Sequence, residues 1–400
     1  MAHSIHELPA PAVERFDRST VGLLPMAFLA AAAVGLVGSL IGFIGWRDQF
    51  AYSWLFACTY FFTLCAGGLF WTILHHATDS EWSVVVRRQM ENLGSLIPIF
   101  FLLFLPLILF CAPLLWTWWN LKVGDDPVYD AKHGFLNHGF FWFRYIVYFV
   151  VLGGVAWLLR NASIAQDTDG QGRHSHFMRK LSVLGLILFG VGLTFAAVDW
   201  LMGLDWKWFS TMWGVYIFAG TAGSSMSLIV IITIALQARG YLKPVNLEHF
   251  HIMGKYMLAF TIFWAYIGFS QYMLIWYANI PEENIYFRIR NTGGWWYFSL
   301  LLVVGRFFIP FPILLTQWIK KHPRRLGWLA WWVLFMQLID IYVVVLPSLH
   351  RTGFRPSIFD LTALLGVGGV VGWLWLRSVG EANLFPTRDP RLSGSITITN

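Results

Sequence analysis

Long apolar runs alternate with short polar stretches along the whole chain. Because a helix needs about 20 apolar residues to cross a bilayer, each long run is a candidate transmembrane span. Backbone groups in lipid must be satisfied internally, and the runs lack the period-two alternation of a β-barrel, so we expect helices. There are ten such runs, at residues 21–46, 50–74, 95–119, 140–160, 181–203, 208–237, 251–277, 294–318, 326–346 and 359–377.

The composition supports lipid as the main solvent. Hydrophobic residues make up 57% of the 400 residues and charged residues only 12%, about half the charged share of a soluble protein. We therefore predict an all-α integral membrane protein with an N-terminal segment (1–20), a ten-helix transmembrane domain (21–377) and a C-terminal tail (378–400). The first residues are mixed polar, so we expect no signal peptide.

The net charge of +7 first suggests nucleic acid. However, the densest basic run, residues 320–325, lies between two apolar runs, where basic residues orient helices. We therefore expect lipids and no nucleic acid as partners. The three cysteines, Cys58, Cys65 and Cys111, lie inside apolar runs without a CxxC motif, which is typical of buried packing.

Ten spans put both termini on one side of the membrane. Loops on that side carry 17 Lys and Arg residues against 8 on the other, which predicts that both termini are cytoplasmic. Residues 120–139 and 278–293 form the longest loops on the outer side, and either loop is a candidate for docking a partner.

One group of polar residues lies toward the cytoplasmic side of the spans. Its members are His75, His76, His249, His251, Lys255 and Tyr256. They are either interfacial residues at helix ends, where His and snorkelling Lys are common, or the inner mouth of a hydrated proton path, which suits the titration range of His.

A second group lies deeper or toward the outside. Asp199 and Asp205 lie at the end of the fifth run, with Asp205 expected to cap or start the next segment. Arg306 and Asp340 lie within the eighth and ninth runs, where an ionisable residue needs a partner, water or a proton. Asp340 is either clamped by Arg306 or carries a proton from the inner histidines to Asp199, and we prefer the second interpretation.

The sequence offers no recognisable ligands for a redox centre. The histidines fall in loops or at helix ends, whereas a transmembrane haem requires them inside the bilayer. There is no cysteine pattern for an iron–sulfur cluster and no phosphate-binding loop. We therefore expect no cofactor bound by this chain and no catalytic or metal-ligating residue.

Several stretches carry a family resemblance. The most specific is Trp-Tyr-Ala-Asn-Ile-Pro-Glu-Glu at residues 276–283. Others lie at residues 198–205, 208–211, 214–216, 248–251, 254–255, 263–272, 275–283 and 308–311. Together they resemble the F-subunit (ActF) family of bacterial alternative complex III, which belongs with the NrfD/PsrC-like membrane proteins. The resemblance covers most of residues 20–377.

The resemblance implies two four-helix bundles plus two further helices in a bacterial inner-membrane subunit of a quinol:electron-acceptor oxidoreductase. It implies as partners a paralogous quinol-binding membrane subunit, an iron–sulfur subunit, and multihaem and monohaem cytochrome c subunits. Menaquinol would act in the complex, while haem c and iron–sulfur clusters would belong to partner subunits. Relatives often carry His at the position of Arg306, so a permanent charge here replaces a protonatable group.

We therefore expect a non-redox membrane subunit that provides proton half-channels beside the quinol-binding subunit. Two alternatives stay open. In the first alternative, the chain itself binds quinol, for which its abundant aromatic residues are only a weak signal. Otherwise it is a free-standing secondary transporter, which would favour inverted repeats that the sequence does not display.

Overall fold

The computed structural model describes residues 14–399, which form helices and contain no strand. Ten helical segments are long and apolar enough to cross a membrane, which confirms the predicted all-α integral membrane protein. The segments are Leu24–Gly45, Arg47–Ala77, Val84–Leu115, His138–Asp169, Gly172–Asp205, Trp213–Gln237, Leu247–Ala278, Trp295–Leu315, Pro323–Ser348 and Ile358–Val379.

Four of the ten spans are not single α-helices. The ninth runs from α15 (Pro323–Val345) into a 3-10 turn (Leu346–Ser348). The third consists of α3 (Val84–Gly94), α4 (Ile97–Pro106), a π-helical turn (Leu107–Cys111) and α5 (Ala112–Leu115). The eighth consists of α12 (Trp295–Leu302), a π-helical turn (Val303–Phe308) and α13 (Pro310–Leu315). In the fifth, α8 (Gly172–Trp200) runs into a 3-10 turn (Met202–Asp205).

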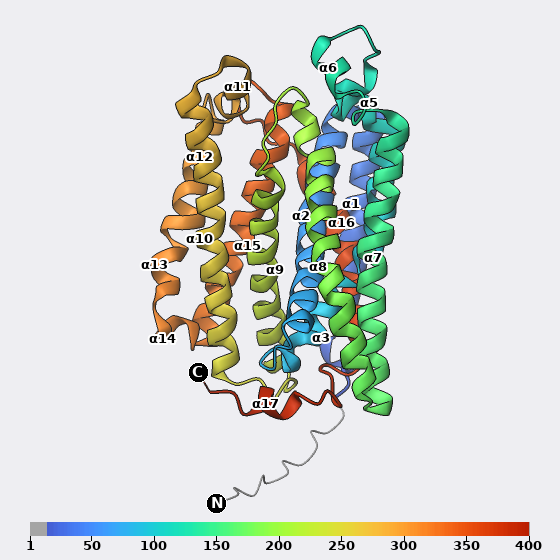
Figure 1. Ribbon diagram of the computed structural model, residues 1–400, viewed down its shortest axis with the longest axis vertical. Coiled ribbons are helices and arrows are strands. Elements are labelled where there is room, and N and C mark those ends of the chain that lie inside the picture. Colours follow the sequence, from blue (N-terminus) through green and yellow to red (C-terminus); the bar gives the residue numbers. More distant parts are fainter. Residues whose placement is uncertain (1–13, 400) are drawn as a thin grey trace, which may run out of the picture.

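The spans pack as two four-helix bundles and a helix pair (Figure 1). The first bundle contains α2 (Arg47–Ala77), the third span, α7 (His138–Asp169) and α8. The second contains α9 (Trp213–Gln237), α10 (Leu247–Ala278), the eighth span and α15 (Pro323–Val345). Helices α2 and α9 join the bundles, and the pair of α1 (Leu24–Gly45) and α16 (Ile358–Val379) packs against α2. This is the arrangement that the resemblance implied.

Small residues let α1 and α16 approach closely. A Cβ atom added to Gly35 would lie 2.0 Å from the backbone nitrogen of Gly366, and one added to Gly369 would lie 2.4 Å from that of Ala32. Neither position has room for a side chain. Close backbone approach through small residues is a usual way for helices to associate where lipid provides no hydrophobic driving force.

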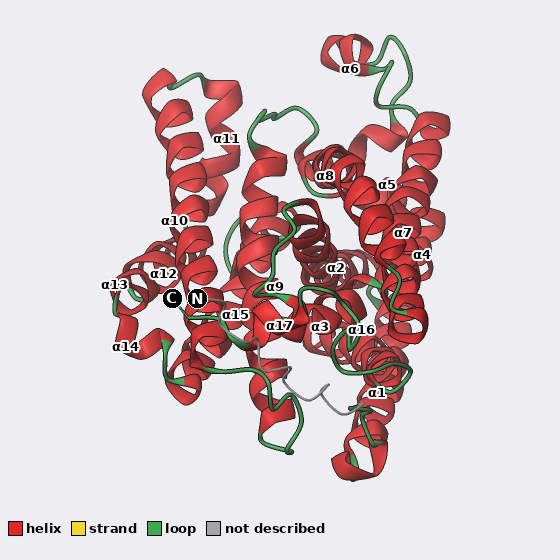
Figure 2. Cartoon of the chain, turned by 60° about the horizontal axis from the view of Figure 1, so that its bottom comes forward, coloured by secondary structure: helices red, strands yellow, loops and turns green. Residues whose placement is uncertain are grey.

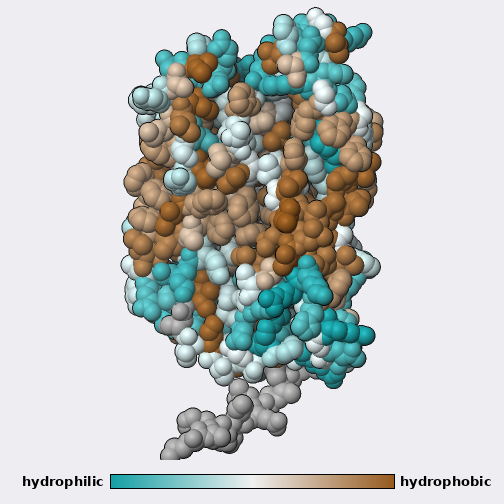
Figure 3. All heavy atoms as spheres, viewed as in Figure 1, coloured by the Kyte–Doolittle hydropathy of each residue, from teal (hydrophilic) through white to brown (hydrophobic). Residues whose placement is uncertain are grey.

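Both ends of the described chain lie at one end of the molecule, hereafter the terminal end (Figure 1). The backbone N–H of Leu384 donates to the carbonyl of Glu14, and α17 (Leu392–Ile396) crosses this end below α3 and α9 (Figure 2). The opposite, distal end carries α6 (Pro127–Lys132) and α11 (Pro281–Arg290). An apolar belt lies between the two more polar ends (Figure 3).

Two expectations about boundaries need correction. The third span begins at Val84, eleven residues before the predicted start at residue 95, because the polar residues of α3 are buried rather than exposed in a loop. Residues 120–139 and 278–293 are not plain loops, since they contain α6 and α11. Of the predicted N-terminal segment 1–20, residues 1–13 lie outside the described part, and the C-terminal segment packs against the bundle.

Candidate functional site

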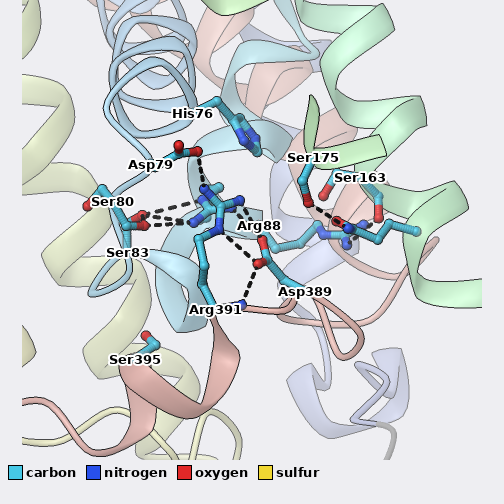
Figure 4. A network of polar contacts seen from close by, with 12 residues as sticks. His76, Asp79, Ser80, Ser83, Arg88, Ser163, Ser175, Asp389, Arg391 and Ser395 are labelled. Atoms are coloured by element: carbon cyan, nitrogen blue, oxygen red, sulfur yellow. Dashed lines mark hydrogen bonds and ion pairs between the residues drawn. The ribbon is translucent and has the colours of Figure 1, made fainter. Parts of the chain in front are cut away.

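A cluster of buried charges fills the terminal end of the first bundle. Arg87, Arg88 and Glu91 lie on α3, which follows the short turn after α2, and each is at most 2% exposed. Asp389 of the C-terminal segment contacts Arg87, and Arg391 binds the same carboxylate (Figure 4). Charges buried this deeply need close partners of opposite sign.

Arg87 is fixed by the turn beneath it and by the C-terminal segment. Its guanidinium donates to the carboxylate of Asp389 at 2.8 Å and to the carbonyl of Ser80 at 3.0 Å. Arg391 holds the same carboxylate at 2.9 Å and also donates to Asp79 at 3.1 Å. Burial alone would raise the pKa of Asp389, but the charges of Arg87 and Arg391 more than offset this and hold that pKa well below its usual range.

Arg88 links α3 to α7 and to a neighbouring histidine. It donates to the carboxylate of Asp167 at 2.8 Å, and its Nε lies 3.2 Å from Glu91, close enough for an ion pair but misaligned for a hydrogen bond. The other carboxylate oxygen of Glu91 lies 3.8 Å from Nε2 of His76. A continuous set of charged and titratable groups therefore runs from the exposed terminal end to the end of α2.

The inner part of this cluster is rich in polar atoms without protein partners. Within the described residues, the four ring nitrogens of His75 and His76 and both carboxylate oxygens of Glu91 make no hydrogen bond, although all three residues are at most 2% exposed. Buried polar groups are nearly always hydrogen-bonded to protein or to ordered water. The unpartnered atoms of His76 and Glu91 lie as close as 3.8 Å and are suited to bind internal water.

Aromatic side chains enclose His75. Its ring stacks on Trp71 with centroids 5.7 Å apart and meets Trp82 edge-on at 5.0 Å. Tyr256 of α10 lies 6.1 Å away and stacks on Trp82. The expected meeting of α2 and α10 residues at this level therefore includes His75 and Tyr256.

Within residues 14–399, the other α10 residues of the predicted inner group make no hydrogen bond or ion pair with His75, His76 or Glu91. Nδ1 of His249 lies 2.8 Å from Oδ1 of Asn246, the residue that caps α10, so His249 has a capping role. His251 lies 3.4 Å from Glu248 on the same helix. Lys255 is exposed and makes no side-chain hydrogen bond within residues 14–399. The six predicted residues thus do not form one site.

The second bundle holds a buried ion pair between its third and fourth spans. Nη1 of Arg306 lies 2.7 Å from Oδ2 of Asp340, and the indole nitrogen of Trp264 donates to the same oxygen at 3.2 Å. The hydroxyl of Tyr216 donates to Oδ1 of Asp340, and Arg306 also donates to Gln337. The preferred picture of an unpaired Asp340 needs correction, because this geometry is that of a clamp.

The first bundle has a corresponding pair. Arg144 of α7 binds both carboxylate oxygens of Asp199 on α8, at 2.8 and 2.7 Å, and the hydroxyl of Tyr148 donates to Asp199 at 2.6 Å. Asp205 was expected to cap the next segment. Its side chain instead lies 3.4 Å from Arg351, and α9 begins only at Trp213.

The second bundle contains a cavity of about 830 Å³. Helices α10, α12 and α15 form its walls, α11 closes its distal end, and Asp340 and Tyr216 lie along its deep side. Most of the lining is aromatic or aliphatic, including Trp264, Phe269 and Phe307.

Sequence reasoning missed Arg87, Arg88, Glu91, Asp389 and Arg290. Hydropathy leaves residues 87–91 between two predicted runs, although Arg-Arg-x-x-Glu has the i,i+3 spacing of a helical ion pair, which is a usable signal. Tyr216 and Trp264 were hidden because aromatic residues are common throughout the chain.

The fold and these buried charges define a polytopic helical membrane protein with an ion pair in each bundle and a polar cluster at its terminal end. A scan against protein-family models gives no match, and a search of curated proteins gives none either.

Proposed function

We propose that the protein is a membrane subunit of a bacterial quinol:electron-acceptor oxidoreductase of the alternative complex III type. In this proposal it binds no redox cofactor and provides a proton half-channel from the cytoplasm through the cluster at its terminal end. The family resemblance of residues 276–283 and of the other stretches is the basis for the complex, and the terminal-end cluster is the basis for the proton path.

The observation that carries the proton path is the set of buried polar atoms of His75, His76 and Glu91 that have no hydrogen-bond partner within residues 14–399. Water bound there would connect these groups, and Arg88, Asp167, Arg87 and Asp389 continue the polar set toward the terminal surface. Neutral His and ionised Glu can both accept a proton from water and return it. A chain of such groups is typical of proton relays within membranes.

The orientation belongs to the same proposal. Counting basic residues favours a cytoplasmic terminal end. The haem-bearing and iron–sulfur subunits would then bind at the distal end. There the sequence stretch 276–283 forms an exposed corner between α10 and α11, with Trp276 and Tyr277 66% and 81% exposed. Exposed aromatic side chains at such a corner suit either a membrane interface or a partner subunit.

The first test is purification of the full chain from its native membrane in mild detergent. We expect a quinol-binding membrane subunit, an iron–sulfur subunit and cytochrome c subunits to co-purify, with haem ligated by the partners and menaquinol oxidised by the whole complex. A chain that purifies alone and catalyses solute transport would support the transporter alternative instead.

The second test addresses the half-channel. Glu91→Gln in the assembled complex should lower the number of protons moved per electron, while the complex still assembles and oxidises quinol. The matched control is Glu381→Gln, which removes the same charge from a half-exposed residue at the same end. Unchanged proton stoichiometry in Glu91→Gln would refute the half-channel.

A further inference from the structure

The cavity in the second bundle opens sideways at the level of the apolar belt. Its rim is made by exposed residues of α10 and of the eighth span, including Tyr266, Phe269, Leu300 and Val303. Below the rim, α10 packs against the π-helical turn of the eighth span and against α13, which closes the terminal side of the cavity. A molecule in the surrounding lipid could therefore enter between α10 and α12.

The distal end of the same cavity contains a buried cation that no acidic residue in the described part of the chain neutralises. Arg290, the last residue of α11, is 5% exposed and lines the cavity. Its guanidinium donates to the backbone carbonyls of Val343, Tyr286 and Val344 at 2.8–3.0 Å. No ion pair within residues 14–399 includes Arg290, whereas each of the other buried arginines binds a carboxylate, namely Arg87, Arg88, Arg144 and Arg306.

The charge of Arg290 is therefore only partly compensated. A guanidinium has five N–H donors, of which three are used here. Carbonyl dipoles and the ring of Tyr286, 3.4 Å from the guanidinium carbon, offset part of the desolvation cost. An unpaired buried charge is costly, so an anion reaching the remaining donors would be bound favourably.

We propose that this cavity binds an anionic membrane phospholipid, with the phosphate at Arg290 and an acyl chain lying between α10 and α12. The side chain of Asn291 lines the cavity beside Arg290 and offers a further amide donor. Basic pockets between transmembrane helices are suited to acidic lipid head groups.

The placement matches the orientation of a lipid in the distal leaflet. The arginine lies at the distal end, where α11 covers the bundle, and the apolar lining extends from it toward the middle of the belt past Leu302, Val303 and Phe307. A head group would thus remain near the membrane surface while its chain follows the cavity inward. Trp296 and Tyr272 at the rim are residue types that favour the interface.

The test uses the full chain, in the complex if it co-purifies with one, after exhaustive washing in detergent. Retained phosphorus is measured after incubation with dioleoylphosphatidylglycerol or with zwitterionic dioleoylphosphatidylcholine. The wild type should retain the anionic lipid in preference. Arg290→Gln should weaken its retention roughly fivefold, the factor expected for one basic residue near a lipid head group.

Arg290→Gln also removes hydrogen bonds to backbone carbonyls and could misfold for that reason, so a second variant tests the cavity independently. Ala265→Trp fills the cavity between α10 and α12 while leaving Arg290 in place, and it should displace the lipid equally. Arg288→Gln is the matched control, since Arg288 lies on α11 but is exposed and does not line the cavity. This control should retain lipid like the wild type.

Three results would overturn the proposal. The first is equal retention of the two lipids by the wild type, and the second is unchanged retention in folded Ala265→Trp. The third is a bound isoprenoid quinone, measured in an organic extract by its ultraviolet absorbance, that Ala265→Trp displaces without loss of phosphorus. None of these measurements depends on quinol oxidation or on the proposed proton path, so the two proposals fail separately.

Discussion

The guanidinium of Arg306 lies 2.7 Å from the carboxylate of Asp340, and both side chains are almost fully buried. The arginine belongs to the third span of its bundle and the aspartate to the fourth. Arg144 and Asp199 hold the same two positions in the first bundle, 2.7 Å apart. In each bundle, a pair of opposite charges therefore links the third span to the fourth.

Removing one partner of such a pair leaves the other charge buried without a counter-ion. Asp340→Asn leaves Arg306 buried without an anion, so we expect it to lower the free energy of unfolding by about 3–5 kcal/mol. Thermal unfolding in detergent, compared with Asp48→Asn at an exposed position on α2, measures the effect. A variant as stable as the wild type would mean that Arg306 is solvated by another route.

Tyr148 provides a graded test of the first pair. Its hydroxyl is one of several donors to Asp199, whereas Arg144 provides the neutralising charge. Tyr148→Phe should therefore lower the free energy of unfolding by only about 1 kcal/mol, the usual contribution of one hydrogen bond. Arg144→Met, measured in the same denaturation series, should cost several times more. Equal costs would show that the hydroxyl, and not the charge, sustains the pair.

The glycine contact between α1 and α16 predicts strong steric sensitivity. Gly35→Ala would bring its Cβ into the backbone of Gly366, so the helices must separate and the melting temperature should fall. Gly190→Ala on α8 is the control, because nothing lies within 4 Å of a Cβ there. This control should be neutral or slightly stabilising, because alanine stabilises a helix interior relative to glycine. Similar melting temperatures for both variants would contradict the tight contact.

The docking of the C-terminal segment should resist mild acid. The folded pKa of Asp389 is held below its unfolded value, so its contribution to stability is complete above about pH 3.9 and is lost as pH falls through the folded pKa. A nitroxide on the exposed position of Ser393→Cys should stay immobile from about pH 8 to 5. The native cysteines are buried, which favours selective labelling.

The control for that experiment is Asp389→Asn, which removes the charge bound by Arg87 and Arg391. In this variant, the nitroxide spectrum should be that of a mobile label at every pH. Mobility that appears in the wild type already near neutral pH would indicate that a group other than Asp389 holds the segment.

Sequence patterns were sufficient for the number of spans and the all-helical class. Each span is an apolar run of bilayer length, and that signal needs no knowledge of neighbours. The Arg306–Asp340 pair was one of two interpretations that the sequence left open, and we preferred the other one, because opposite charges on consecutive spans do not reveal whether their helix faces meet.

The polar beginning of the third span was not foreseeable by the same logic. Hydropathy assigns Arg87, Arg88 and Glu91 to a loop, and they are buried only because Asp167 and the C-terminal segment provide partners far away in sequence. Arg290 was missed for a related reason, since its partners are backbone carbonyls, which leave no trace in side-chain patterns.

The contact between Arg87 and Asp389 has a consequence for the biogenesis of the chain. The two residues are 302 positions apart, so at about 5–20 residues per second the ribosome needs roughly 15–60 s to supply the aspartate. During that interval α3 has been made but its arginine lacks its anion, and the beginning of the third span must wait at the lipid–water boundary. Closure of the terminal end by the C-terminal segment is therefore a late event, which follows the synthesis of Arg87 by roughly 15–60 s.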